Sequence, residues 1–423
     1  MQVIGIDIGT TSICGVAVDT VSGEVKASKT VDSNAFIKTD KPFEKIQSAD
    51  KIITLAKCIL DELICEETVA IGVTGQMHGI VYYDENGKAA SPLYTWQDGR
   101  GDQPFGDTTY SGFLGSYTGY GNVTDFYNKE NGLVPENSSS YCTIHDLFVM
   151  ELCGLSSAVM HISDAASFGL FDLENDRFLN GFAPKIEKGF AVAGKYNGIP
   201  VSVAIGDNQA SVFSSLSSED DILLNFGTGS QISLISDVPR SGKDIETRPF
   251  FDGKYLIVGA ALCGGRAYAL LKNFYESFLN YTSVRDEDVY TVMDKMAALA
   301  TEPLTVDTRF SGTRADENVR GSINNISVEN FTPENLTRGV LTGMVDELFG
   351  MYGQMDVKKN GLVGSGNGIR KNRHLVKIAE EIFKSEIKIP VHTEEAAYGA
   401  ALYGMVSSGI CKNADEARKL IRF

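Results

Sequence analysis

The sequence predicts an α/β protein built from two similar domains, and three observations lead to this prediction. The chain has 423 residues, which is more than one hydrophobic core usually accommodates. Segments with strand and helix patterns alternate along it, as they do in α/β folds. The motif Ile-Asp-Ile-Gly-Thr-Thr-Ser at 6–12 returns as Leu-Asn-Phe-Gly-Thr-Gly-Ser at 224–230. A recurrence near the middle of the chain fits two domains of common ancestry.

Composition excludes several classes of partner. The formal net charge of −17 argues against nucleic acid or an anionic membrane surface as the main partner. No apolar run is long enough for a membrane span. The chain starts directly with a strand pattern, so we expect no secretory signal. Its seven cysteines include no CxxC pair, and we therefore expect reduced thiols and a cytoplasmic protein.

The elements of the first half follow from local patterns. Each copy of the repeated motif lies between two strand-like runs, which predicts a hairpin with a tight Gly-Thr turn. Helical spacing of apolar residues extends over 43–64 and resumes at 143–152, while 69–73 is a short apolar strand. Residues 101–141 are rich in Gly, Ser, Asn and Tyr, and we expect loops with short helices there.

The second half repeats the alternation. The polar stretch Ser217-Ser218-Glu219-Asp220 precedes the second hairpin and predicts a domain boundary, with domains at 1–217 and 218–423. The expected helices lie at 266–278, 286–299, 333–355, 371–383 and 395–406, and the expected strands at 361–363 and 387–389.

The turn after Asp7 has the chemistry of a phosphate site. Glycine lets backbone N–H groups approach a phosphate closely, and the hydroxyls of Thr10 and Thr11 add donors. A carboxylate beside the turn can hold Mg²⁺ through water. The alternative is a plain hairpin whose Asp caps the turn. A second copy at 227–230 favours the phosphate interpretation, although Asn225 replaces the carboxylate there.

Asp207 is a candidate general base. The apolar run 201–205 ends immediately before Gly206 and Asp207, which places the carboxylate at the carboxyl end of a strand and at the start of a helix. Open α/β sheets bind ligands at such positions. A carboxylate there can accept the proton of a hydroxyl that attacks a phosphoryl group. A helix N-cap explains the aspartate equally well.

Two polar clusters suit a polyol. Gln76 and His78 follow the strand at 69–73, and Trp96, Asp98 and Arg100 follow later in the first half. Sugars are recognised by polar side chains together with a flat apolar face. Four of these residues also have a structural alternative: Trp96 as a core tryptophan, His78 as a satisfied histidine, and Asp98 with Arg100 as a turn pair.

The segment Gly364-Ser365-Gly366-Asn367-Gly368 lies between a strand and a helix. Small residues there would admit an adenine or a ribose, and Asn367 could bond to either. A tight strand–helix connection explains the glycines equally well, because short Gly-rich signals are weak.

Taken in order, the motifs resemble the FGGY family of carbohydrate kinases, members of the actin-like ATPase superfamily. The resemblance covers nearly the whole chain. It implies two actin-like (ribonuclease H-like) domains, each a mixed sheet flanked by helices, with the active site in the interdomain cleft. Within the family, the segment 143–178 is similar to the sedoheptulokinases, while xylulokinases share a similar GQMHG motif. The motifs are DIGTTS at 7–12, GQMHG at 75–79, TWQDGR at 95–100, GDNQAS at 206–211, NFGTGS at 225–230, FSGTR at 310–314, GSGNGIRKN at 364–372 and EEAAYGAA at 394–401.

The resemblance also implies roles for individual residues. Asp207 would take the proton from the terminal hydroxyl of the sugar, and Asp7 and Asp207 would lie near Mg²⁺. The phosphates of ATP would contact Gly9, Thr10, Thr11, Ser12, Gly227 and Thr228, and its adenosine Gly364, Gly366 and Asn367. The sugar would contact Gln76, Met77, His78, Trp96, Asp98, Arg100, Asp207 and Arg314.

The expected reaction is ATP-dependent phosphorylation of sedoheptulose to sedoheptulose 7-phosphate, with D-xylulose or another ketose or polyol as the alternative. A non-enzymatic nucleotide switch or a sugar sensor is the rival interpretation, and a homodimer is compatible with the family. The sequence departs from the family pattern in two ways. Ser365 stands where glycine is common, which requires a negative φ at that residue, and the region 101–141 is short.

Overall fold

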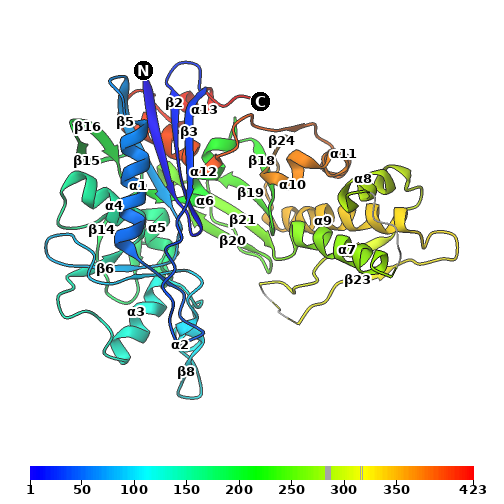
Figure 1. The fold of residues 1–423 in the computed structure, drawn as a ribbon, viewed down its shortest axis with the longest axis horizontal. Helices are drawn as coiled ribbons and strands as arrows, with labels where there is room; N and C mark the ends of the chain where they lie inside the picture. The colour runs from blue at the N-terminus through cyan, green and yellow to red at the C-terminus, as the bar shows by residue number, and fades with distance from the viewer. Residues whose placement is uncertain (282–286, 315, 317) are drawn as a thin grey trace. The chain divides into compact units, whose positions relative to one another are not determined.

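The computed structural model describes residues 1–281, 287–314, 316 and 318–423, and these form two compact units (Figure 1). The first unit comprises Met1–Ser217, Pro249–Lys254 and Glu394–Arg422. The second comprises Ser218–Arg248, Tyr255–Thr393 and Phe423.

The first unit is built on a mixed sheet in the strand order β15-β16-β5-β1-β2-β3. Strand β1 is antiparallel to β2 and parallel to β5, so it lies at the centre of the sheet. The hairpin predicted from the first Gly-Thr motif is formed by β1 and β2. The strands are β1 (Gln2–Ile8), β2 (Ser12–Asp19), β3 (Val25–Asp32), β5 (Thr68–Gly75), β15 (Val192–Tyr196) and β16 (Ile199–Ser202).

The second unit repeats this arrangement in the strand order β20-β21-β19-β18-β24-β25. Strand β18 is antiparallel to β19 and parallel to β24, as β1 is to β2 and β5. Even the registers correspond, because Asp7 pairs with Thr74 and Asn225 pairs with Ser365. Five strands of each sheet correspond, with β3-β2-β1-β5-β16 matching β21-β19-β18-β24-β25, and this confirms the predicted fold of two similar α/β domains. The strands are β18 (Asp221–Phe226), β19 (Ser230–Ser236), β20 (Ile245–Pro249), β21 (Tyr255–Ala261), β24 (Gly361–Ser365) and β25 (Ile387–Lys388).

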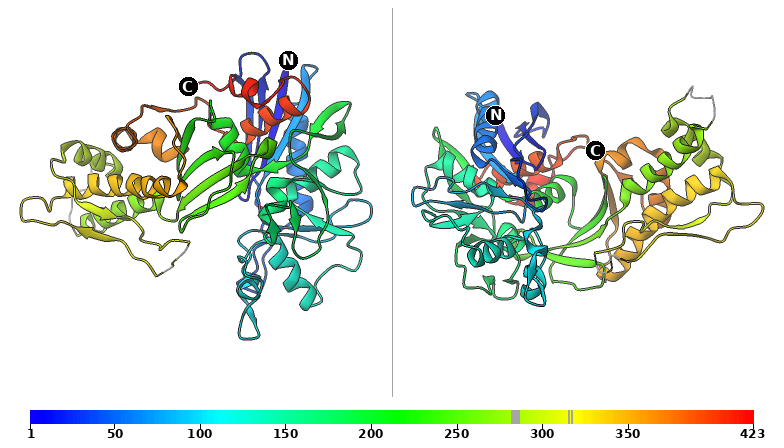
Figure 2. Two further views of the ribbon diagram at one scale, coloured as in Figure 1. Left: turned by 180° about the vertical axis from the view of Figure 1, so that it is seen from behind. Right: turned by 60° about the horizontal axis from the view of Figure 1, so that its bottom comes forward.

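The predicted helices of the second unit are present with small shifts at their ends. Helices α7, α8 and α11 pack against the long α9 (Figure 2). Residue 286, the expected start of one helix, lies outside the described residues. The helices are α7 (Gly264–Leu279), α8 (Val289–Leu299), α9 (Pro333–Met355), α10 (Gly366–Lys371) and α11 (Arg373–Phe383).

One predicted helix of the first unit is too long. Helix α1 spans Ala49–Leu63 and begins after Ser48, whose side chain accepts a hydrogen bond from the Lys51 N–H. The expected start at residue 43 was wrong because residues Ile46–Gln47 form strand β4, paired with β7 (Leu93–Tyr94). As the N-cap, Ser48 fixes where the helix begins, because its side chain accepts from a backbone N–H that has no partner within the helix.

The predicted extent of the second domain is also wrong at its end. Helix α12 (Glu395–Ser407) belongs to the first unit, where it packs against β1 and β5. A Cβ on Gly5 would lie 1.9 Å from the Ala397 carbonyl oxygen, and one on Gly72 would lie 1.8 Å from that of Ala400. Two glycines on adjacent strands thus let the helix approach the sheet closely.

Helices α12 and α1 cover opposite faces of this sheet. Gly15, which contacts Ile59 of α1, pairs with Ile6 and so lies on the face opposite to Gly5.

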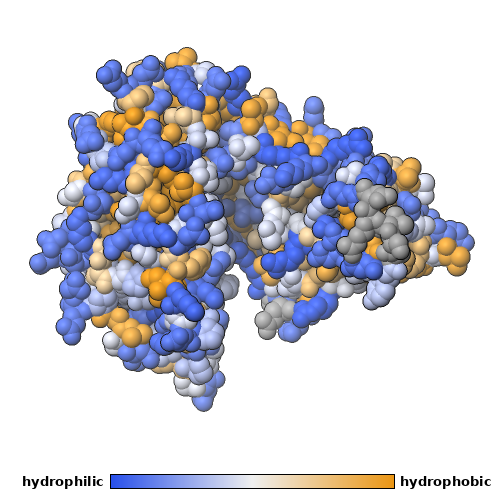
Figure 3. Space-filling model, in the orientation of Figure 1, coloured by the Kyte–Doolittle hydropathy of each residue, from blue (hydrophilic) through white to orange (hydrophobic). Residues whose placement is uncertain are grey.

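The molecular surface shown in Figure 3 is dominated by hydrophilic residues with scattered apolar ones. Within the described parts of the chain, no helix has both the length and the apolar character that crossing a membrane requires.

Candidate active site

The ends of three strands of the first unit bring Asp7 and Asp207 to one edge of the sheet. Both β1 and β17 (Ile205–Gly206) run parallel to β5, and Asp7 and Ile205 each pair with Thr74. Helix α6 (Asp207–Ser215) starts at Asp207. The predicted place of Asp207, at a strand end that opens a helix, is therefore observed. Gly206 is the N-cap, so Asp207 does not serve as that cap.

The electrostatics at this edge suit a cation. Burial raises the pKa of Asp7 well above its ordinary value, and the neighbouring charges of Asp207 and Glu394 raise it further. Among the described residues, the buried Oδ1 of Asp7 has no hydrogen-bond partner. The described residues hold no cluster of three metal-binding side chains. Mg²⁺ fits such a site, because it is commonly held by one or two carboxylates with waters and substrate phosphates completing its shell.

Thr10 connects the predicted phosphate turn to the predicted sugar residues. Its hydroxyl donates to Gln76 Oε1 at 3.1 Å and accepts from the Trp96 indole N–H at 3.0 Å. The Thr10 carbonyl accepts from Gln47 Nε2 at 2.7 Å and from Ser33 Oγ at 3.1 Å. The turn is therefore held in place by side chains from several segments of the first unit. Gly9, Thr11 and Ser12 complete it, with Thr11 exposed.

His78 has an unusual backbone conformation, with φ of 71°. A positive φ in a residue with a side chain is uncommon and persists only where its surroundings hold it. The His78 N–H donates to Ser167 Oγ at 3.1 Å, and Nδ1 lies 2.8 Å from the Ser167 carbonyl oxygen. Its ring stacks on Tyr120 with centroids 4.3 Å apart and an interplanar angle of 10°.

We call Gln76 and His78 the polar wall of the site. Gln76 is buried and donates from Nε2 to Gln47 Oε1 at 3.1 Å. Met77 is buried as well, and a Cβ on Gly206 would lie 2.6 Å from its sulfur, so Met77 packs beside the residue that precedes Asp207. Trp96 is 47% exposed, which leaves part of its ring available to a ligand.

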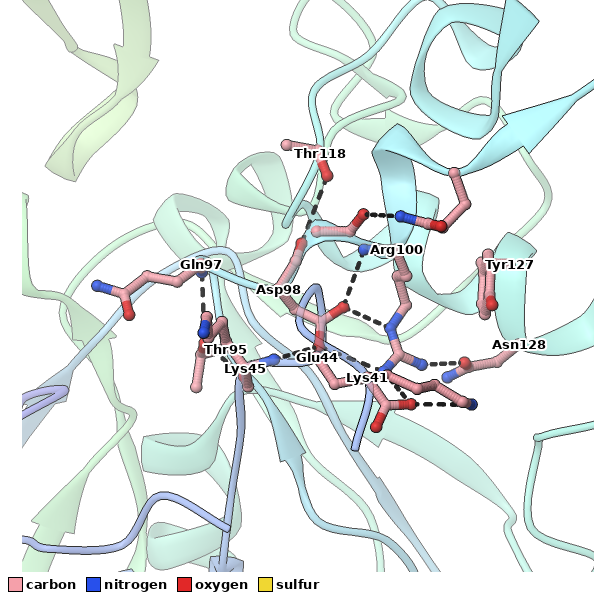
Figure 4. A network of polar contacts seen from close by, with 12 residues as sticks. Lys41, Glu44, Lys45, Thr95, Gln97, Asp98, Arg100, Thr118, Tyr127 and Asn128 are labelled. Atoms are coloured by element: carbon pink, nitrogen blue, oxygen red, sulfur yellow. Dashed lines mark hydrogen bonds and ion pairs between the residues drawn. The ribbon is translucent and has the colours of Figure 1, made fainter. Parts of the chain in front are cut away.

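Asp98 and Arg100, which we expected to bind the sugar, instead bond to each other and to other residues of the interior (Figure 4). Both are buried, at 0% and 1% exposure. Asp98 accepts from the Lys45 N–H at 2.9 Å and from Arg100 Nε at 2.6 Å, while Arg100 also donates to Asn128 Oδ1. The arginine stacks on Tyr94, 4.2 Å from the ring centroid. This geometry matches the alternative of a turn pair, which supports the loop carrying Trp96.

The predicted nucleotide residues of the second unit lie on two adjacent strand ends. Gly227 and Thr228 form the turn from β18 to β19, and their carbonyls accept from the N–H groups of Gly265 and Arg266 at 3.0 and 2.9 Å. Gly364 and Ser365 end β24, and Gly366 and Asn367 start α10. Asn225 Nδ2 donates to Ser365 Oγ at 2.8 Å, which ties the two strand ends together.

Ser365 has the negative φ that a residue with a side chain requires at this position. Its φ is −135°, so serine adopts the backbone conformation without strain. Gly366 has φ of +83°, and a Cβ there would lie 2.8 Å from the Phe226 carbonyl oxygen. Glycine is therefore required at 366 and not at 365.

Arg314 belongs to the second unit, whereas the other predicted sugar residues belong to the first. It is exposed and pairs with Glu246 Oε1 at 3.0 Å. Arg314 therefore lies in a different unit from Gln76 and His78.

Sequence reasoning missed three residues that contact the site, Gln47, Tyr120 and Ser167. None lies in a recognisable motif, and only the richness of 101–141 in tyrosine pointed toward Tyr120.

Three buried titratable groups, His145, Asp146 and Asp164, lie in the interior near Asp207. His145 Nε2 and Asp164 Oδ1 are 3.1 Å apart, and both side chains are 0% exposed. Burial raises the pKa of Asp164, and the charge of Asp207 raises it further. The neighbouring Asp146 accepts from the Thr143 hydroxyl at 2.7 Å, yet burial, with a further rise from Asp164, raises its pKa to about 7.

The raised pKa of Asp146 predicts a specific dependence of stability on pH. Because the folded state binds more protons than the unfolded state between about pH 4 and pH 7, the free energy of unfolding should fall as pH rises through that window. Asp146→Asn should make this fall shallower, as measured by the Tm across the window. Asp84→Asn is the control, since the pKa of Asp84 is lowered by the Lys88 N–H and its contribution is confined to more acidic pH. Equal slopes for wild type and Asp146→Asn would contradict the prediction.

Comparisons with known proteins match most of the chain. Residues 2–106 match the N-terminal domain model of the FGGY family of carbohydrate kinases, and residues 223–408 match its C-terminal domain model. Sedoheptulokinase from Mus musculus is 29% identical over 94% of this chain and 96% of its own length. A xylulose kinase from Staphylococcus epidermidis is 22% identical over 95% of this chain and 88% of its own. Among solved structures, xylulose kinase from Rhodospirillum rubrum superposes with a TM-score of 0.84 at 20% identity, covering 100% of this chain and 93% of its own.

Proposed function

We propose that this chain, which belongs to the FGGY family of carbohydrate kinases, transfers the γ-phosphoryl group of ATP to the terminal hydroxyl of a ketose. Sedoheptulose is the preferred substrate and sedoheptulose 7-phosphate the product. One observation carries the proposal. The two carboxylates Asp7 and Asp207 lie at the same edge of the sheet, beside the polar wall of Gln76 and His78. The choice of sugar is supported by similarity to sedoheptulokinases over nearly the full length.

The proposed chemistry assigns each group a task. Asp207 orients the attacking hydroxyl and accepts its proton, while Gln76, His78 and the exposed ring of Trp96 hold the sugar. Asp7 and Asp207 would hold Mg²⁺, which when bound offsets the charge of the phosphates. The donors of the turn at 9–12 in the first unit, and of Gly227 and Thr228 in the second, would stabilise phosphate oxygens.

Substrate identity is tested by ADP release with a panel of ketoses and polyols. We expect the highest kcat/KM with sedoheptulose and a lower value with D-xylulose. A preference for D-xylulose would replace the substrate and keep the reaction, an outcome that the relatives named xylulose kinase make a specific alternative. Absence of turnover with every sugar would overturn the kinase proposal, and sugar binding without ADP release would identify a sensor.

The adenosine site in the second unit makes a separate prediction. Gly366→Ala should raise the KM for ATP about tenfold or more, because alanine is strained at φ of +83° and meets the Phe226 carbonyl oxygen. Gly353→Ala in α9 is the control in the same unit, since a Cβ there would meet no atom within 4 Å and its φ is not positive. Steady-state kinetics at saturating sugar measure both variants. An unchanged KM for ATP in Gly366→Ala would show that this segment does not bind the nucleotide.

A cytoplasmic location is part of the proposal. It is supported by the cysteines, which are all free, with Cys14, Cys142, Cys263 and Cys411 buried. Free thiols are typical of reducing compartments.

A further inference from the structure

The short helix α5 (Ile162–Ser167) contacts both sides of the proposed site. Its two buried serines are four residues apart, so they occupy one side of the helix about one turn from each other. Ser167 bonds to His78 and Ser163 bonds to Gly206, the residue before Asp207. We propose that α5 is a positioning element in which Ser167 sets the sugar-binding histidine and Ser163 sets the general base. This inference rests on the proposed function.

On the sugar side, Ser167 makes two different bonds to one histidine. Its hydroxyl oxygen accepts from the His78 N–H, and its carbonyl oxygen lies 2.8 Å from His78 Nδ1. A carbonyl oxygen only accepts, so Nδ1 carries a hydrogen, and in the neutral ring Nε2 is then the acceptor. Together with the stacking of Tyr120, these bonds hold His78 at its positive φ. Ser167 therefore determines both the direction of the ring and its tautomer.

On the base side, Ser163 connects a buried histidine to the strand end. The Ser163 N–H donates to His161 Nδ1 at 3.2 Å, so Nδ1 of this ring is an acceptor. The Ser163 hydroxyl lies 2.8 Å from the same nitrogen and therefore donates to it, which leaves its oxygen to accept from the Gly206 N–H at 3.1 Å. Burial lowers the pKa of His161 to about 3, so the ring stays neutral. This chain of bonds fixes the peptide from which Asp207 extends.

We expect substitutions of the two serines to change different kinetic parameters, the KM for the sugar in one case and kcat in the other. Ser167→Ala leaves the His78 N–H without its acceptor, and we expect the KM for the sugar to rise about fivefold to tenfold with kcat within about twofold of wild type. Ser163→Ala displaces Asp207, and we expect kcat to fall about tenfold with the KM for the sugar within about twofold. Ser167→Thr and Ser163→Thr keep the hydroxyl and should recover most of the lost parameter.

A readout without turnover tests the same geometry. In the long-range ¹⁵N–¹H spectrum of the full chain, which has five histidines, His78 should show the Nδ1–H tautomer and His161 the Nε2–H tautomer. Ser167→Ala keeps the carbonyl that faces His78 Nδ1 and removes the hydroxyl that accepts from the His78 N–H, so we expect the tautomer to persist while the ¹⁵N shifts of His78 move and those of His161 stay unchanged. If both alanine variants change kcat and KM together, or change only the Tm, α5 is merely structural and the inference is wrong. A wild-type protein that turns over no sugar overturns the proposed function instead, while the tautomers still test α5.

Discussion

Asp207→Asn should lower kcat at least ~10²-fold, the low end for the loss of a general base. Asparagine has nearly the same shape and remains compatible with the first turn of α6, but it does not accept the proton of the attacking hydroxyl. The KM for the sugar should change little, because the amide still accepts one hydrogen bond. Steady-state ADP release with the preferred ketose measures both parameters.

The same variant should be at least as stable as the wild type. The charge of Asp207 raises the pKa of Asp7 and of Asp164, which means that Asp207 repels the ionised forms of both carboxylates in the ligand-free protein. Removing one charge relieves that repulsion, so the Tm without ligand should stay level or rise. A variant that is active at nearly the wild-type rate would show that Asp207 is not the base. A variant that loses activity together with its Tm would attribute the loss to misfolding.

Gly5→Ala should destabilise the first unit by about 3 kcal/mol or more, at the upper end of the range for overpacking. The added Cβ would lie 1.9 Å from the Ala397 carbonyl oxygen and 2.8 Å from the Ala401 nitrogen of α12. These are backbone atoms, so no side-chain rotation relieves the clash, and the helix must move away from the sheet. Denaturant unfolding and the Tm measure the loss.

Gly189→Ala is the matched control in the same unit. Its Cβ would meet only Asp252 Oδ1 at 3.4 Å, an ordinary contact, and the change should stay within about 0.5 kcal/mol. Equal stability of Gly5→Ala and wild type would mean that α12 does not pack on β1 as the structure shows. Because α12 follows the second unit in the sequence, the result also tests whether the end of the chain completes the first unit.

Much of the site could be anticipated because its motifs are local. The Gly-Thr turns lie between strands whose alternating patterns are readable, and Asp207 directly follows an apolar strand. The backbone requirement at Ser365 was also deducible, since it depends on one dihedral angle. Burial is different, because it depends on residues distant in sequence. Asp98 and Arg100 looked like sugar ligands, yet Lys45 and Asn128 satisfy them in the interior.

The repeated glycine-threonine motif, together with the length of the chain and the alternation of strand and helix patterns, predicted two related α/β domains, because strand and turn propensities act over a few residues. Only the tertiary structure decided to which unit α12 belongs and which polar side chains are buried. It also identified α5 as the link between His78 and Asp207. Those features arise from contacts between segments many residues apart, such as Ala397 on Gly5 and Ser167 on His78, and such contacts leave no pattern in one sequence.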